Sequence, residues 1–353
     1  MLFSIVFYNI IVIQALLFML AYLKIKTLSR YVFFCCSLLT ILIPSAVRFE
    51  IGTDYLNYKD IYTQIGFGTY SDNTEILFYY INLMLSSLGL DFQYLIIITS
   101  LIFCFFISLC VKRESSIWFF LFILLFIYLP SYNILRQAIS ISISCYALYR
   151  YFYFHEKISF PFIIVLSSFF HISSVLFLLF PFFLDLKLSI KTRFVLILFF
   201  YFFMEYFVDI IFQSDFFLNS HYSYYLGSDY LERTNLGSGV GVFFQLFPYF
   251  VLIFFGNRII NDDEKLNRLA NLSLIIVLCK FLVINFYVFN RVEIMFFVFS
   301  AFVYTEVSVN RKRSFPCALL FLYWTLVNLY IFEMSLINKV HGVVPYISVW
   351  SGS

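Results

Sequence analysis

The sequence predicts an all-α, polytopic integral membrane protein with about twelve membrane segments. Of its 353 residues, 63% are hydrophobic and only 12% are charged, and the mean hydropathy is +0.93. A soluble domain is typically about 45–50% apolar and about 25% charged. In lipid, a helix satisfies its backbone groups within its own segment, so apolar stretches of this length predict helices. We expect one transmembrane domain over residues 1–353, with outer-face polar loops at about 48–74 and 213–239.

The composition also limits the classes of function. The net charge is only +3, so a nucleic-acid partner is not implied. All seven cysteines lie in apolar segments, without the spacing of a disulfide framework or a metal site. The chain contains no P-loop, dinucleotide-binding glycine turn, HExxH or Gly-x-Ser-x-Gly motif. We therefore expect no nucleic acid, no cofactor and no metal.

Hydropathy places the membrane segments. They occur at 2–23, 31–47, 75–89, 92–111, 117–134, 138–154, 158–184, 194–212, 240–256, 269–289, 292–309 and 315–334. The segment 75–89 is short, and we expect it to lie along the outer interface or to re-enter. The segment 158–184 is long, and we expect two short helices that meet near His171.

Basic residues orient these segments, because cytoplasmic loops are enriched in Lys and Arg. Sixteen of the 23 lie in six clusters, which we place in the cytoplasm: Lys24, Lys26 and Arg30; Lys112 and Arg113; Arg150 and Lys157; Lys187, Lys191 and Arg193; Arg258, Lys265 and Arg268; Arg311, Lys312 and Arg313. Both termini are then outside. Arginines that remain on the outer face need another explanation, because this rule depletes them there.

The segment 48–62 is a dense polar run that lipid would reject. Thr53 or Asp54 is positioned to cap a short helix, and Tyr55, Tyr58 and Tyr62 have the spacing of one helix face. Asp54 has two interpretations, which the sequence leaves open. It is a helix cap, or it is a general base or an acceptor of sugar-hydroxyl hydrogen bonds.

Three further polar sites are expected on the outer face: Arg136-Gln137, His171 and Asn290-Arg291. Arg136 begins a helix whose face carries Ser140 and Ser144. Two interpretations of Arg136 stay open. In the first, the serine face packs against another helix and the Arg136 side chain extends to the membrane interface. In the second, the Arg136 guanidinium binds a phosphate group with two parallel hydrogen bonds.

The remaining charged residues inside apolar segments have simple pairings. Glu293 is a candidate partner of Arg291. Glu205 and Lys280 lie in mid-span, where an ionisable residue is a functional candidate, although a mutual ion pair is the simpler explanation. His171 is a satisfied core group or a functional one.

The order of these motifs resembles that of the EpsG family, which belongs to the Wzy-like polysaccharide polymerases. The resemblance rests on Arg48-x3-Gly52-Thr53-Asp54-Tyr55-x2-Tyr58, Glu75, Arg136-Gln137, Phe170-His171-x-Ser173, Asn290-Arg291 and Val344-Pro345-Tyr346. It covers nearly the whole chain in order. The short, Gly/Ser-ended tail departs from the commoner pattern.

The resemblance implies a GT-C-like glycosyltransferase of the bacterial inner membrane that acts in O-antigen (lipopolysaccharide) or exopolysaccharide synthesis. Such enzymes join oligosaccharide repeat units carried on undecaprenyl diphosphate at the periplasmic or outer face, without a metal. The lipid bilayer and the lipid-linked oligosaccharide are the implied partners, together with a chain-length-determining co-polymerase.

This reaction assigns roles to the outer polar residues. A diphosphate leaving group needs cations, for which Arg48, Arg136 and Arg291 are the candidates. The acceptor hydroxyl needs a base, for which Asp54 is the first candidate and His171 the second. The expected sugar contacts are Tyr55, Tyr58, Glu75, Gln137 and Asn290, and the tyrosines at 222–230 are further candidates for stacking on sugars.

Two other functions fit part of the pattern. One is an O-antigen ligase or another polyprenyl-linked glycosyltransferase, although ligases usually carry a larger outer loop than the one at 213–239. The other is a flippase or exporter of lipid-linked sugars. Exporters commonly show repeat symmetry, which this sequence lacks.

Cysteine-accessibility labelling checks the predicted orientation. We expect cysteines introduced at positions 57 and 225 to react with an impermeant reagent from outside, and one at position 263 to react only from the cytoplasm, because the basic clusters flank 263. Labelling of position 57 from the cytoplasm alone would reverse the orientation.

Overall fold

The fold is given by a computed structural model that describes residues 1–70, 74–112, 115–218, 239–260, 262–285, 289–312 and 314–351. The side chains at 205, 211, 216, 217 and 285 lie outside that description. Within these ranges every regular element is a helix, and the one extended pairing is an isolated antiparallel bridge between Arg48 and Ser348. The prediction of an all-α chain is confirmed.

Six stretches of the described chain are long and apolar enough to cross a membrane. They are α1 (Leu2–Lys24), α5 (Phe92–Leu109), α12 (Val240–Phe255) with the 3-10 turn η5 (Gly256–Arg258), α13 (Asp263–Asn285), α14 (Asn290–Phe296) with α15 (Val298–Asn310), and α16 (Phe315–Ile337). The protein is therefore a multi-pass membrane protein. The figure of about twelve segments stays a prediction.

Other helices coincide with further predicted segments. They are α2 (Arg30–Ala46), α4 (Ile76–Ser87), α6 (Ser116–Phe126), α7 (Leu135–Phe154) and α10 (Ile190–Gln213). The predicted segment 117–134 ends early as an α-helix and continues as the 3-10 turn η1 (Pro130–Tyr132), where Pro130 has no amide hydrogen to donate to the preceding turn. Of the predicted loop 213–239, α11 (Asp215–Leu218) is described, and residues 219–238, with the tyrosines at 222–230, lie outside the described residues.

The chain divides into two compact units. One comprises Met1–Leu178 and Asn328–Ser353, and the other comprises Leu179–Val327, so that α16 runs from the second unit into the first. The single domain expected over 1–353 stays a prediction.

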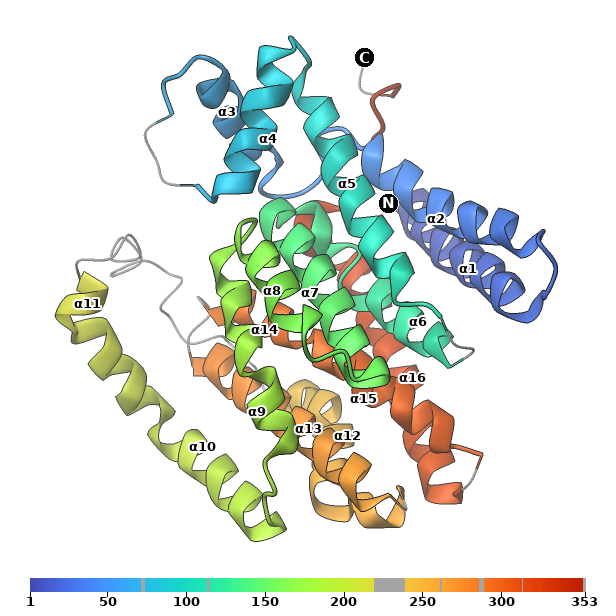
Figure 1. The fold of residues 1–353 in the computed structure, drawn as a ribbon, viewed down its shortest axis with the longest axis vertical. Coiled ribbons are helices and arrows are strands. Elements are labelled where there is room, and N and C mark those ends of the chain that lie inside the picture. The colour runs from blue at the N-terminus through green and yellow to red at the C-terminus, as the bar shows by residue number, and fades with distance from the viewer. Residues whose placement is uncertain are drawn as a thin grey trace. The chain divides into compact units, whose positions relative to one another are not determined.

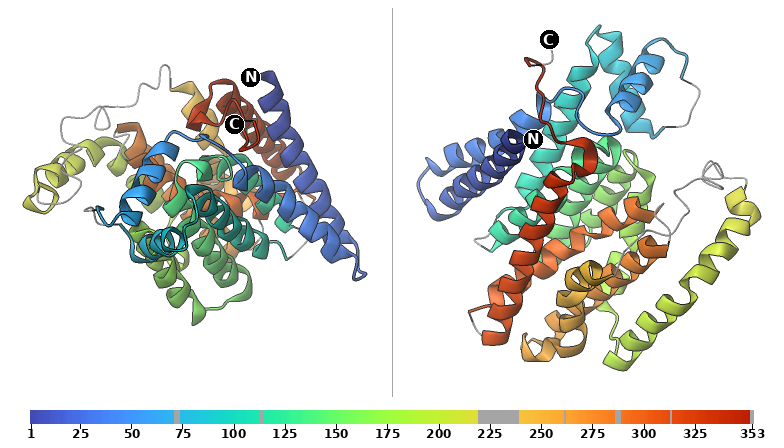
Figure 2. Two further views of the ribbon diagram at one scale, coloured as in Figure 1. Left: turned by 90° about the horizontal axis from the view of Figure 1, so that it is seen from above. Right: turned by 180° about the vertical axis from the view of Figure 1, so that it is seen from behind.

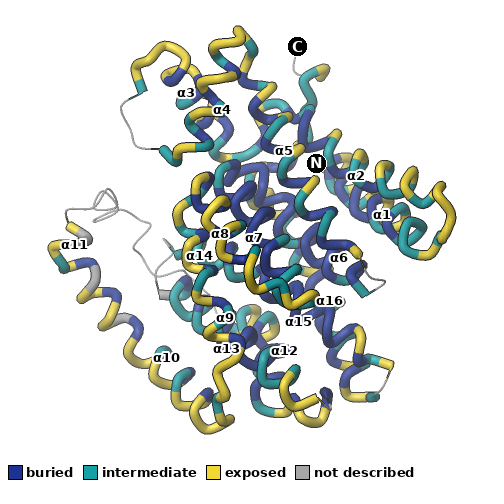
Figure 3. Tube along the Cα trace, viewed as in Figure 1, coloured by how far each residue is buried: buried dark blue, intermediate teal, exposed yellow. Residues whose placement is uncertain are grey.

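In the first unit, α1 and α2 lie side by side as an antiparallel pair (Figures 1 and 2). Helix α5 packs against α2 and α7, and α7 packs against α8 (Ser159–Ser168). Helices α6 and α7 are buried along most of their length (Figure 3).

Small residues explain how α7 and α8 approach each other. The hydroxyl of Ser167 on α8 lies 2.9 Å from that of Ser140 and 2.8 Å from that of Ser144, and it donates to the carbonyl of Ser140 at 2.8 Å. All three serines are fully buried. Without a hydrophobic driving force between helices in lipid, small side chains and hydrogen bonds of this kind hold helices together. This contact places Arg136, at the first turn of α7, beside the end of α8.

The predicted break near His171 is confirmed. Helix α8 ends at Ser168, and a 3-10 stretch, η2 (Ile172–Leu179), leads into α9 (Phe180–Asp185). His171 lies between them. The carbonyl of Phe169 accepts a hydrogen bond from the amide of Leu77 at 3.1 Å, which ties this break to the start of α4.

The second unit is built around α13. This helix contacts α9, α10, α12, α14 and α15. It begins six residues before the predicted segment because Asp263 and Glu264 occupy its first turn, where acidic side chains favour a helix but interrupt an apolar pattern.

Buried polar groups lock the second unit together. The amide of Asn271 donates to the carbonyls of Phe183 and Leu186 at 2.8 Å each, and its oxygen accepts from Arg193 at 3.0 Å. Lys280 donates to Glu293 at 2.8 Å, so the partner of Lys280 is Glu293 rather than the predicted Glu205.

Candidate functional site

Glu75 joins three elements of the first unit through one carboxylate. Its Oε2 lies 2.6 Å from Nη1 of Arg136, and its Oε1 lies 2.7 Å from Nδ1 of His171. Glu75 is at the N-cap position of α4, but its side chain makes no capping bond there. The carboxylate therefore holds the first residues of α7 and the break after α8 together.

The guanidinium of Arg136 has further partners around the same point. Nη1 donates to the hydroxyl of Thr74 at 2.9 Å, and the Tyr58 hydroxyl also hydrogen-bonds to this side chain. The guanidinium carbon lies 5.8 Å from the centre of the Phe78 ring. Since a guanidinium carries five donors, these contacts leave it capacity for another anion.

Glu75 is an anion at neutral pH. Burial alone would raise its pKa, but the hydrogen bond from His171 and the charge of Arg136 outweigh burial and lower the pKa from 4.5 to about 2. Because the folded-state pKa is depressed, the stability that Glu75 contributes is present above pH 4.5 and is lost as the pH falls towards 2. Glu75 therefore positions its neighbours and does not donate a proton.

The ionised carboxylate also determines the state of His171. A carboxylate only accepts hydrogen bonds, so Nδ1 of His171 carries a proton. The side chains of Arg136, His171 and Glu75 are 25%, 18% and 15% exposed. A guanidinium and an imidazole that are both fixed by one carboxylate and both partly exposed to solvent are suited to binding an oxyanion.

Asp54 stands at the end of a tightly held loop. It occupies the N-cap position of α3 (Tyr55–Gly66), but its carboxylate makes no capping bond. Its oxygen Oδ1 lies 3.5 Å from the hydroxyl of Thr53. Capping thus does not account for the carboxylate, which is partly exposed.

The loop before Asp54 is fixed by close backbone contacts. The amide of Thr53 donates to Oδ1 of Asn133 at 2.9 Å, and that of Gly52 donates to the carbonyl of Gly342 at 3.2 Å. Gly52 has φ +108°, and a Cβ there would lie 2.7 Å from Asn133 Oδ1 and 3.0 Å from the carbonyl oxygen of Tyr132. Only glycine fits this position.

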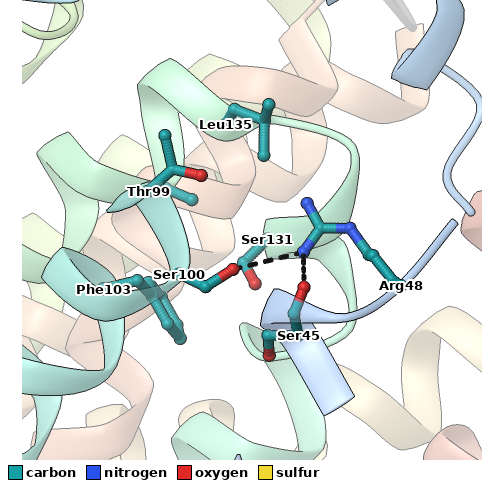
Figure 4. Close-up of a pocket in the computed structure, with 8 residues that line it drawn as sticks. Ser45, Arg48, Thr99, Ser100, Phe103, Ser131 and Leu135 are labelled. Carbon is teal, nitrogen blue, oxygen red and sulfur yellow. Dashed lines mark hydrogen bonds between the residues drawn. The ribbon is translucent and has the colours of Figure 1, made fainter. Parts of the chain in front are cut away.

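Arg48, predicted to contact the diphosphate, is buried at 1% exposure. Its Nη1 donates to the carbonyl of Ser45 at 2.7 Å (Figure 4). Its guanidinium carbon lies 4.3 Å from the centre of the Tyr132 ring. The cavity beside it is about 10 Å³, whereas ligand pockets begin at about 300 Å³. This placement makes Arg48 an anchor of the loop and leaves no room there for a diphosphate.

The predicted sugar-stacking tyrosines of α3 are also buried. The Tyr55 ring packs edge-on against Phe92 at 5.1 Å, and the Tyr58 ring packs against Phe78 at 5.9 Å. Both rings belong to the apolar cluster between α3, α4 and α5. Their burial, at 4% and 6% exposure, holds α3 against α4 and α5, and their predicted contact with sugars stays a prediction.

The other predicted residues fall in separate places. Gln137 is buried in α7 at 3% exposure. Asn290 and Arg291 begin α14 in the second unit, where Arg291 is exposed, and Glu293 pairs with Lys280. Among the residues that the structure describes, no three His, Cys, Asp or Glu side chains lie close enough together to hold a metal ion.

A comparison with protein-family models finds that residues 31–348 match the EpsG family. The matched range includes the 48–62 segment, Glu75, Arg136, His171 and the motif at 344–346. The chain belongs to the EpsG family. No curated protein and no solved structure matches it.

Membership of the EpsG family, a Wzy-like polymerase family, gives the chain a polymerase-like role in polysaccharide synthesis and supports an enzymatic function.

Sequence reasoning singled out Arg136, His171 and Glu75 but did not pair them. It missed Thr74 and Asn133, which carry no charge or motif. It also missed His341, although a histidine beyond the last apolar segment was a usable signal.

Substitution of Gly52 tests how firmly the loop is held. Gly52→Ala adds a left-handed backbone cost of about 1 kcal/mol and a steric clash of about 1–3 kcal/mol. Gly68→Ala is the matched control, because Gly68 also has positive φ but a Cβ there meets nothing within 4 Å. We expect thermal unfolding of the purified protein to show a clearly larger loss of stability for Gly52→Ala. Equal losses would mean that the contacts to Tyr132 and Asn133 do not constrain the loop.

Proposed function

We propose that this EpsG-family protein is a polysaccharide polymerase that joins oligosaccharide repeat units carried on undecaprenyl diphosphate. The products would be exopolysaccharide or O-antigen chains. We place the reaction at the outer face of the bacterial inner membrane, in a GT-C-like architecture of about twelve membrane segments. A chain-length-determining co-polymerase is the expected protein partner.

The observation that carries this proposal is the Glu75 cluster. Transfer of a glycosyl group from a lipid diphosphate leaves negative charge on the diphosphate, and that charge must be stabilised in the transition state. Arg136 offers a guanidinium in a fixed orientation, which suits bidentate contact with phosphate oxygens. Glu75 fixes this orientation at 2.6 Å and holds His171 beside it.

Because both side chains contact the Glu75 carboxylate, His171 lies next to Arg136. An imidazole there adds a donor, or a positive charge, to the leaving-group side of the reaction. We therefore assign Arg136 and His171 to the diphosphate, with Glu75 as the residue that positions both. The assignment of Arg291 to the diphosphate stays a prediction from the sequence.

The acceptor side of the reaction is assigned to the 48–54 loop. A carboxylate that accepts a hydrogen bond from a sugar hydroxyl orients this hydroxyl for attack on the anomeric carbon. Asp54 is partly exposed and is not used for capping, which suits this role. An acceptor that attacks from the face opposite the diphosphate inverts the anomeric centre by direct displacement, and this reaction needs no metal.

Variants of Arg136 test the proposal against a matched control on the same helix. Arg136 pairs with Glu75 at the start of α7, and Arg150 pairs with Glu156 near its end, about 21 Å further along the helix. We expect Arg136→Ala to lower the polymerisation rate at least about 100-fold, because one charge-stabilising group is lost. Arg136→Lys should be intermediate, since it keeps the charge and loses the fork. Arg150→Ala should extend chains normally.

The readout is the length distribution of polysaccharide in cells that express each variant at equal membrane levels. Glu75→Gln should reduce chain length less than Arg136→Ala, because the amide still accepts a bond from Arg136. Wild-type chain length in Arg136→Ala would remove the assigned diphosphate contact. Equal defects in Arg136→Ala and Arg150→Ala would mean that only the stability of α7 is being measured.

A further inference from the structure

The turn that follows α16 has an unusual backbone. Lys339, His341 and Gly342 have φ values of +54°, +68° and +63°. Left-handed conformations are uncommon for residues with a side chain and are comfortable for glycine. Two of these three positions nevertheless carry long polar side chains. Such residues persist only where the surroundings impose the conformation, and they gather at functional sites.

The surroundings that impose it are the loop ending at Asp54. The carbonyl of Gly342 accepts a hydrogen bond from the amide of Gly52 at 3.2 Å, and a Cβ on Gly342 would lie 3.3 Å from the amide nitrogen of Thr53. On the loop side, Glu50 and Gly52 are left-handed as well, with φ +50° and +108°. Two strained turns are therefore pressed together beside Asp54.

The residues after the turn hold it in place. The hydroxyl of Tyr8 on α1 donates to the carbonyl of Val343 at 2.9 Å. The amide of Phe49 donates to the carbonyl of Ile347 at 3.0 Å, next to the bridge between Arg48 and Ser348. The position of His341 relative to the loop is thus fixed by the contacts of Gly342 and of the residues that follow it.

The imidazole of His341 has no internal role that accounts for it. It is partly buried, and within the described part of the chain it makes no hydrogen bond or ion pair. Burial lowers the pKa of His341 below its ordinary value of 6.5, which favours the neutral ring at pH 7. A neutral imidazole has one nitrogen that can accept a proton.

We propose that His341 is the general base that deprotonates the acceptor hydroxyl, with Asp54 orienting that hydroxyl from the adjacent turn. The inference rests on the proposed polymerase function. As the acceptor oxygen forms its bond to the anomeric carbon, the bond between that carbon and the diphosphate oxygen breaks. The electron pair leaves with the diphosphate, and the hydroxyl proton passes to the free ring nitrogen of His341 and then to water.

The left-handed backbone provides the test. His341→Asn removes the base, and asparagine tolerates this conformation. His341→Gly removes the base, relieves the backbone and opens space for a small molecule. Lys339→Asn and Lys339→Gly are the matched controls, because Lys339 is left-handed in the same turn and has no imidazole.

We expect both His341 variants to extend a defined undecaprenyl-diphosphate repeat unit at least about 100-fold more slowly than wild type, with little change in KM for this substrate. Both Lys339 variants should stay close to wild type. Added imidazole should restore part of the rate of His341→Gly and leave that of Lys339→Gly unchanged.

Three results would overturn the proposal. Near-normal rates in both His341 variants would show that the polymerase works without this base. A loss of rate that imidazole fails to restore, with equal losses in the Lys339 variants, would make the turn purely structural. A wild-type protein that extends nothing would remove the polymerase function and the role of His341 with it, so the two failures are distinguishable.

Discussion

The ion pair and hydrogen bond made by Glu75 are the interactions on which the proposed chemistry depends. One carboxylate is 2.6 Å from Arg136 and 2.7 Å from His171. Most of α7 and all of α8 separate these two residues in the sequence. An anion that is mostly shielded from water is costly unless it is paired. The same requirement that stabilises Glu75 therefore fixes the guanidinium and the imidazole in advance of any ligand. Preorganised charge of this kind stabilises a transition state without rearranging when the reaction occurs.

The second constraint is the pairing of the first polar loop with the last turn of the chain. Arg48 anchors the loop, because its buried guanidinium contacts backbone carbonyls and the Tyr132 ring. Gly52 and Gly342 allow two backbones to touch at 3.2 Å. This contact brings residues 290 positions apart in sequence, such as Gly52 and Gly342, into one small region, and Asp54 and His341 are carried with them.

Much of the fold could be predicted because lipid enforces a simple pattern. The helices, the break near His171 and the short helix from Tyr55 all follow from apolar length and spacing.

The partners of the polar side chains could not be predicted from the sequence. The sequence predicts both Arg48 and Arg136 at the outer face, yet Arg48 is buried and Arg136 is only partly buried. The sequence does not show this difference, because burial depends on which helices close around each residue. Tyr55 and Tyr58 were expected to face sugars but pack into the core, since an aromatic ring suits either place. The left-handed turn at His341 left no pattern in the sequence beyond a histidine next to a glycine.

The most direct test of the account is polymerisation by the purified protein, supplied with a defined undecaprenyl-diphosphate repeat unit and no other enzyme, with and without a chelator. The account predicts a ladder of lengthened lipid-linked chains, released undecaprenyl diphosphate in equal number to the linkages made, and the same rate when the chelator is present. A wild-type protein that binds the lipid-linked unit but never lengthens it would contradict the account and favour transport. A rate that chelator abolishes and added divalent metal restores would contradict the assignment of the leaving group to Arg136.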